Sequence, residues 1–111
     1  MLVRFDADGS LDTSFSGGTV TAAIGAFTTD IGRSIYVQPD GKILVAGSAG
    51  LSAMMYSYLL LARFLPDGTL DGSFNGGIFM NPVGGSYAIA QAVAIDPDGA
   101  VLTAGFTGIS T

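Results

Sequence analysis

An apolar stretch interrupted by Pro-Asp-Gly occurs twice in this chain, at residues 37–47 and again at residues 94–105. In each copy the tripeptide stands between two apolar runs, which is the pattern of a β-hairpin. Proline presets φ at the first turn position, and glycine supplies the φ > 0 position without steric cost. A chain that contains the same hairpin twice is constrained to a repeated β architecture.

The repetition extends well beyond this hairpin. Residues 2–5 (LVRF) match residues 61–64 (LARF), and residues 8–15 (DGSLDTSF) match residues 67–74 (DGTLDGSF), in both cases 59 positions later. The two Pro-Asp-Gly turns are 58 positions apart, so the second copy has lost one residue. So many ordered matches predict two copies of one structural unit.

Each unit contains four predicted strands. The first is expected at 34–38 and 92–96, the second at 42–47 and 100–106, the third at 58–64 and 2–5, and the fourth at 78–83 and 19–24. Tight Asp-Gly turns are expected between the first and second strands and between the third and fourth. In the second strand Ile43, Leu44, Val45 and Ala46 do not alternate with polar residues, so both faces should be buried.

A four-stranded sheet that is covered on both faces and repeats at about 58 residues is typical of a β-propeller blade. The strand order predicts half a blade at residues 1–33, a complete blade at 34–91 and another half at 92–111. The expected fold is therefore all-β, with about two blades of four antiparallel strands per chain. A β-sandwich with an internal duplication is the less favoured alternative.

The two half-blades are complementary, because one supplies the third and fourth strands of a blade and the other supplies the first and second. Left open, each would expose a strand edge and an apolar face. We therefore expect neighbouring molecules to complete each other's blades and close a homo-oligomeric ring, with a trimer of six blades favoured over a tetramer of eight. The alternative is that the remaining blades belong to a longer polypeptide.

Residues 8–15, 37–47 and 61–64 together resemble the bacterial repeats often called delta-60 repeats, and the similarity covers nearly the whole chain. The resemblance implies a β-propeller fold, a place in long secreted or cell-surface bacterial proteins, and no agreed activity or catalytic residues. The chain departs from the repeat in the apolar segment 49–57 and at Ala100, which stands where the other copy has Lys42.

Composition excludes several classes of function. The chain contains no His, no Cys and no Glu, which argues against thiol or histidine catalysis, disulfides and the usual zinc sites. We predict no catalytic residue, no metal and no cofactor. A net charge of −5 and four scattered basic residues argue against a nucleic-acid partner. The apolar run at 51–64 is too short and interrupted for a membrane span, and residues 1–6 do not resemble a signal peptide.

Arg4 and Arg63 lie in otherwise apolar strands, each eight residues before an aspartate, Asp12 and Asp71. A structural ion pair in each copy would compensate a partly buried guanidinium, and we prefer this interpretation to an anion-binding site.

The aspartates at 6–12 have the alternate spacing of a calcium loop. The second copy, at 65–71, lacks the first of these carboxylates, and neither copy has a downstream Glu. A turn in which the aspartate accepts hydrogen bonds from its own backbone explains both copies better.

The segment 50–58 is the one stretch that a blade does not require, and we expect a loop there. Its apolar and aromatic side chains suit an adaptable contact with a ligand or partner, although packing within the assembly is an equally favoured alternative. The candidate contact residues are Leu51, Met54, Met55, Tyr56 and Tyr58.

These observations predict a non-enzymatic propeller module that acts as a self-assembling structural or protein-interaction scaffold. Its expected partner is itself, with a glycan or protein ligand as a further candidate. The alternative is a lectin-like propeller that binds carbohydrate or another small ligand through tyrosine stacking, with Tyr36, Tyr56, Tyr58 and Tyr87 as candidates. The family resemblance implies an extracellular or cell-surface location.

Overall fold

The computed structural model describes residues 1–21, 29–51 and 56–109, which form an all-β structure. None of these residues forms a helix with the length and apolar character needed to cross a membrane. Two short 3-10 turns, η1 and η2, accompany the strands. The elements in chain order are β1 (Leu2–Val3), η1 (Ser16–Gly18), β2 (Thr19–Val20), β3 (Thr29–Val37), β4 (Ile43–Leu51), β5 (Tyr56–Phe64), η2 (Asn75–Gly77), β6 (Ile78–Asn81), β7 (Tyr87–Ile95) and β8 (Val101–Gly108).

Strands β3, β4, β5 and β6 pair in that order, each antiparallel to the next, and form the predicted complete blade. Long antiparallel strands follow from their β-branched and aromatic residues and, between β3 and β4, from the Gly-containing turn. Strands β7 and β8 form an antiparallel hairpin that joins the same sheet by one parallel bridge between Ser57 and Tyr87. Strands β1 and β2 form a separate two-stranded sheet.

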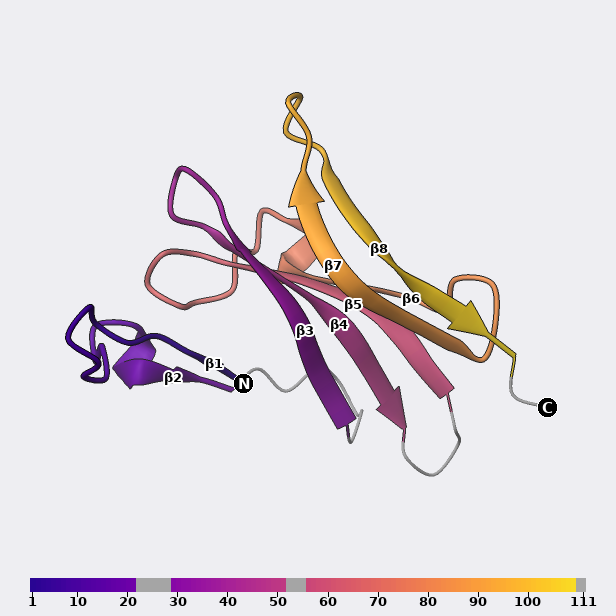
Figure 1. Cartoon of the computed structure of the whole chain (residues 1–111), viewed down its shortest axis with the longest axis horizontal. Coiled ribbons are helices and arrows are strands. Elements are labelled where there is room, and N and C mark those ends of the chain that lie inside the picture. Colours follow the sequence, from indigo (N-terminus) through magenta and orange to yellow (C-terminus); the bar gives the residue numbers. More distant parts are fainter. Residues whose placement is uncertain (22–28, 52–55, 110–111) are drawn as a thin grey trace.

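The complete blade lies between the two half-blades, with β1–β2 on one side and β7–β8 on the other (Figure 1). On the β1–β2 side, Leu2 and Val20 pack against a buried cluster of Phe15, Ile43, Ala62 and Phe64.

On the opposite face, Val93, Ile95 and Val101 of the β7–β8 hairpin pack against the cluster that contains Leu44 and Leu61. This layered arrangement of successive sheets is that of neighbouring propeller blades.

The non-alternating sequence of β4 correctly predicts burial on both faces. Ile43 packs in the cluster on the β1–β2 side, whereas Leu44 and Ala46 pack in the cluster on the β7–β8 side, and all three side chains are buried. Successive residues of a strand point to opposite faces, so an unbroken apolar run requires a layer on each side.

The strands that open each blade begin earlier than the sequence suggests. We expected starts at residues 34 and 92, but β3 begins at Thr29 and β7 at Tyr87. The register shifts between Gly32 and Ser34 in β3, and between Ala90 and Ala92 in β7. An extra residue at each bulge resets the in–out alternation, which hides the first half of the strand from a periodicity argument. The predicted boundaries at 33/34 and 91/92 therefore fall inside strands.

The expected tight hairpin between the third and fourth strands is wrong. The Asp67-Gly68 turn closes only a small loop, bracketed by the bridge between Phe64 and Leu70, and η2 follows before β6 begins. The first half-blade repeats this arrangement, with a bridge between Phe5 and Leu11 and then η1. The connection is therefore a compact corner with its own hydrogen bonds rather than a two-residue turn.

The fourth strands are shorter than predicted. Strand β6 ends at Asn81 because Pro82 has no N–H group with which to continue the ladder. Strand β2 ends at Val20, and the rest of its predicted range lies mostly outside the described residues.

Candidate functional site

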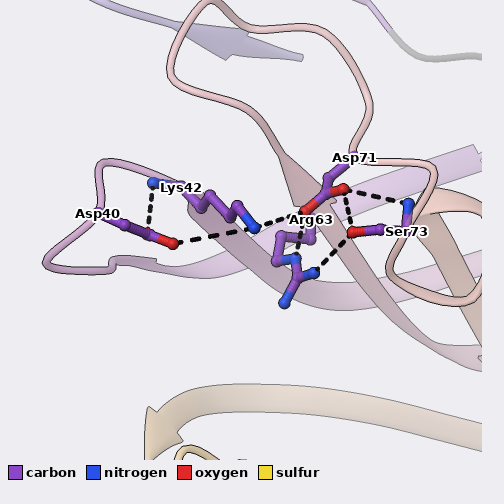
Figure 2. A network of polar contacts seen from close by, with 5 residues as sticks. All are labelled: Asp40, Lys42, Arg63, Asp71 and Ser73. Carbon is purple, nitrogen blue, oxygen red and sulfur yellow. Dashed lines mark hydrogen bonds and ion pairs between the residues drawn. The ribbon is translucent and has the colours of Figure 1, made fainter.

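The corner between β5 and η2 holds a network of polar side chains (Figure 2). Arg63, on β5, donates from Nε to Oδ2 of Asp71 at 2.8 Å, and the Ser73 hydroxyl donates to Asp71 Oδ1 at 2.6 Å. Lys42, which follows the Pro-Asp-Gly turn, brings Nζ to 3.4 Å from Asp71 Oδ2 and 3.8 Å from Asp40 Oδ2. Asp71 is thus a buried carboxylate that is contacted by donors from the β3–β4 turn and from the corner between β5 and η2.

These donors stabilise the ionised form of Asp71. The Ser73 hydroxyl, with its backbone N–H, Lys42 and Arg63, lowers the pKa of Asp71 to about 2, although burial acts in the opposite direction. Hydrogen bonds and cations that favour the ionised carboxylate account for the direction. A carboxylate held in this way is a structural anchor, because a general acid or base needs a pKa near the working pH.

The first half-blade contains the copy of this corner. Arg4 Nε contacts Asp12 Oδ2 at 2.6 Å, and the Ser14 hydroxyl donates to Asp12 Oδ1 at 2.5 Å. Ser14 and Arg4 lower the pKa of Asp12, as in the other copy, with the serine hydroxyl making the largest contribution. Both Arg–Asp pairs that the eight-residue spacing predicts are therefore present, and the carboxylate occupies the place that an external anion would need.

Each arginine also stacks on a phenylalanine. The guanidinium carbon of Arg4 lies 4.5 Å from the ring centroid of Phe15, and that of Arg63 lies 4.4 Å from the ring of Phe74. Arg4 Nη1 additionally donates to the carbonyl oxygen of Pro66 at 2.8 Å, which ties the first half-blade to the corner of the complete blade. Sequence spacing predicts the ion pairs, but not these contacts to the phenylalanines and to the neighbouring blade.

The aspartates of the Asp-Gly turns accept hydrogen bonds from their own turn. Asp8 Oδ1 accepts from the backbone N–H and hydroxyl of Ser10 at 2.9 and 2.6 Å, and Asp67 Oδ1 accepts in the same way from Thr69. These bonds lower the pKa of both Asp8 and Asp67. Across the described part of the chain, no three carboxylates gather in a group that could hold a metal ion.

The predicted contact loop is largely strand, which corrects the expectation. Leu51 pairs with Tyr56, and Ala49 pairs with Tyr58, so β4 and β5 extend into the segment that we expected to be a loop. The aromatic residues favour the extended hairpin. Tyr56 is half exposed and Tyr58 is partly buried. Met54 and Met55 lie outside the described residues.

The tyrosines proposed for sugar stacking come from different environments. Tyr36 packs against the buried cluster that contains Leu44, so its ring is occupied by the core. Tyr87 begins β7 and is partly buried. The contacts of the described residues do not bring these four tyrosines together on one surface.

The sequence predicts open apolar faces beside the half-blades, but it does not identify their residues, which the structure places on β8 and β3. The first lies on β8, where Leu102 is 52% exposed, although its copy in β4, Leu44, is 0% exposed. The second lies on β3, where Ile35 and Val37 are 55% and 60% exposed, although their copies in β7, Val93 and Ile95, are partly buried against the complete blade. A residue-by-residue alignment of the two repeats could have identified both faces.

A groove of about 330 Å³ adjoins the β3 face. Leu2 and Val3 of β1 line one side, and Ile35 and Val45 of the complete blade line the other. It lies between the half-blade β1–β2 and the first strand of the complete blade. That is where the first two strands of the half-blade's own sheet would belong.

Two segments of the chain are similar to a known protein family. Residues 2–15 and 38–74 match a family described as "Domain of unknown function (DUF5122) beta-propeller". The match covers the third strand and corner of the first half-blade and then most of the complete blade. It supports a β-propeller repeat family, in agreement with the strand order. No curated protein and no solved structure matches the chain.

Proposed function

We propose that this protein is a non-enzymatic β-propeller module whose role is to assemble with copies of itself and to act as a scaffold for protein interactions. One observation carries the proposal. The apolar faces left open on β3 and β8 are repeats of the two surfaces that already pack together between the complete blade and β7–β8.

The sequence repeat makes these surfaces equivalent. Within the chain, Leu44 of β4 is covered by Val93, Ile95 and Val101 of the next hairpin. Leu102 repeats Leu44, and Ile35 and Val37 repeat Val93 and Ile95. The β8 face of one molecule and the β3 face of another can therefore form the contact that the chain already makes internally, and such head-to-tail contacts form a ring when the rotation between successive molecules closes.

A ring of three chains, with six blades, is the favoured arrangement, and a ring of four is the alternative. The resemblance to delta-60 repeats supports an extracellular or cell-surface location for such a scaffold.

Light scattering coupled to size exclusion tests the assembly. We expect a mass three or four times the 11.2 kDa of the chain at micromolar concentration. A monomeric mass up to the highest soluble concentration would contradict the proposal. A glycan array tests the lectin-like alternative, since a scaffold should bind no glycan selectively.

A further inference from the structure

We propose that β8 of one molecule pairs with β1 of a second copy, antiparallel and in one defined register, and so completes a four-stranded blade between them. This inference rests on the self-assembly proposed above and adds which strands meet and how they align.

The first observation is the open edge of β8. Strand β4 pairs along one edge with β3 and along the other with β5. Its copy β8 pairs along one edge with β7, and among the described residues no strand pairs with its other edge. An edge of this kind presents a row of backbone N–H and C=O groups to any strand that can align with it.

The second observation is that β1 is the copy of the strand that covers this edge in the complete blade. Residues 2–5 repeat residues 61–64 of β5, including the arginine that forms the corner ion pair. On the other side, β1 pairs with β2 as β5 pairs with β6. A strand that fits residues 101–104 of this edge therefore exists in every copy of the chain, with its outer neighbour already in place.

The complete blade fixes the register. In it Ile43 pairs with Phe64, Leu44 with Arg63, and Val45 with Ala62. Transferred through the repeat, the pairs between molecules are Val101 with Phe5, Leu102 with Arg4, Thr103 with Val3, and Ala104 with Leu2. A shift by one residue would turn every side chain of β1 to the wrong face, so the register is specific.

The phenylalanines provide an independent argument. Phe15 is 0% exposed because it packs against Ile43 and Phe64 of the next blade. Its copy Phe74 packs against the same buried cluster as Val101, the copy of Ile43, but is only partly buried. The copy of Phe64 is Phe5, which is 62% exposed. In the proposed register, Phe5 of the second copy reaches the place beside Phe74 that Phe64 occupies beside Phe15.

A second copy is the occupant that these observations favour, because β1–β2 brings both missing strands together. The groove lined by Leu2 and Val3 is the matching space on the second copy, open where a first and second strand would enter. In this arrangement Phe5 is covered by the blade beside Phe74, and Leu102 lies against the β3 face of the second copy, so the two exposed side chains are buried on opposite faces of the completed blade.

Disulfide trapping tests the register, since the chain has no native cysteine. One preparation carries Val3→Cys and the other carries Thr103→Cys, and the two are mixed, oxidised mildly and separated without reductant. The pair Leu2→Cys with Ala104→Cys is tested in parallel, because neighbouring antiparallel pairs alternate between wider and closer spacing. Leu2→Cys with Thr103→Cys is the control, displaced by one residue. We expect a covalent dimer in at least one matched mixture and none in the control.

The outcomes distinguish this inference from the proposed assembly. If light scattering shows an oligomer but neither matched mixture gives more covalent dimer than the control, the register is wrong while self-assembly stands. If the unmodified chain is monomeric at every concentration, both fail, and a strand from elsewhere must cover β8.

Phe5→Ser gives a second measurement without cysteine chemistry. We expect the protein concentration at which the assembly dissociates to rise at least tenfold, while the β-sheet signal in circular dichroism is retained. The matched control is Leu11→Ser. Leu11 is 43% exposed, and its copy Leu70 in the complete blade is still 38% exposed, so completing the blade should not cover it. Equal effects of the two substitutions would overturn the predicted packing of Phe5.

Discussion

The β3–β4 and β7–β8 hairpins have almost the same local structure and very different surroundings. Both contain a Pro-Asp-Gly turn in which the glycine N–H returns to the carbonyl oxygen three residues earlier, and both have a bulge at the same repeat position. Yet Leu44 is completely buried, while Leu102 is half exposed. Burial in this repeat is therefore set by the neighbouring blade, because the hairpin sequence alone determines only the strands and the turn.

The largest contrast is expected between the two leucines at the same repeat position. Leu44→Ala should lower the free energy of unfolding by about 2–5 kcal/mol, because it leaves a cavity between two layers. Leu102→Ala should change the stability of the isolated chain by less than about 0.5 kcal/mol but weaken the assembly. Urea unfolding at low protein concentration, together with light scattering, measures both. Equal losses of stability in the isolated chain would break the comparison.

The two arginine corners should differ in the same sense. Arg63 is mostly buried and pairs with a buried carboxylate that Lys42 also contacts, whereas Arg4 is more exposed. Removing one partner of a buried pair leaves the other charge uncompensated. In thermal unfolding, we therefore expect the decrease in the unfolding midpoint to be severalfold larger for Arg63→Met than for Arg4→Met. A stable, well-ordered Arg63→Met protein would show that this pair has no structural role.

Acid should weaken the fold through the same carboxylates. The pKa of Asp71 is about 2 in the folded protein, below its usual value of 3.8, so the ionised form contributes stability above pH 4. That contribution is lost as the pH falls from about 4 to about 2. Asp71→Asn should therefore flatten the pH dependence of the unfolding midpoint across this range, and more than Asp12→Asn does. An unchanged slope would contradict the role of Asp71.

The smallest effect concerns Lys42, one of the charged positions that differ between the hairpins. Lys42 contacts Asp71, but Ala100 stands at the same place in the second hairpin. In a blade completed between molecules, Ala100→Lys would bring an ammonium group toward Asp12 of the second copy. Exposed ion pairs contribute little, so the dissociation concentration should fall by less than about fivefold. Ala100→Gln is the control, and an equal effect of both substitutions would show that charge is not responsible.

Much of the fold could be predicted because the chemistry repeats. The ordered matches around Arg4 and Arg63 predict two units, and the unbroken apolar run at residues 43–46 correctly predicts burial on both faces. The eight-residue spacing from arginine to aspartate also anticipates both ion pairs. These features are local or are tested by a second copy within the same chain.

The features that the sequence did not predict depend on geometry between elements. The bulges at Gly32 and Ala90 interrupt the alternation, so the early halves of β3 and β7 could not be recognised by periodicity. The exposure of Ile35 and Leu102 depends on which sheet lies against them, and no local pattern contains that information. The extension of β4 to Leu51 similarly depends on its pairing with Tyr56 of the neighbouring strand.

Residue-resolved amide hydrogen exchange tests the central claim most directly, by comparing β8 with β4 in the same sample. In an antiparallel hairpin, amides alternate between pointing toward one neighbour and the other, so a β8 paired only with β7 should leave every second amide unprotected. We predict that the β8 amides from Val101 to Ala104, the part that β1 covers in the proposed register, are protected like their copies in β4 at high concentration, and that alternate ones lose protection on dilution. Alternate amides between Val101 and Ala104 that exchange rapidly at every concentration would contradict blade completion by a second copy.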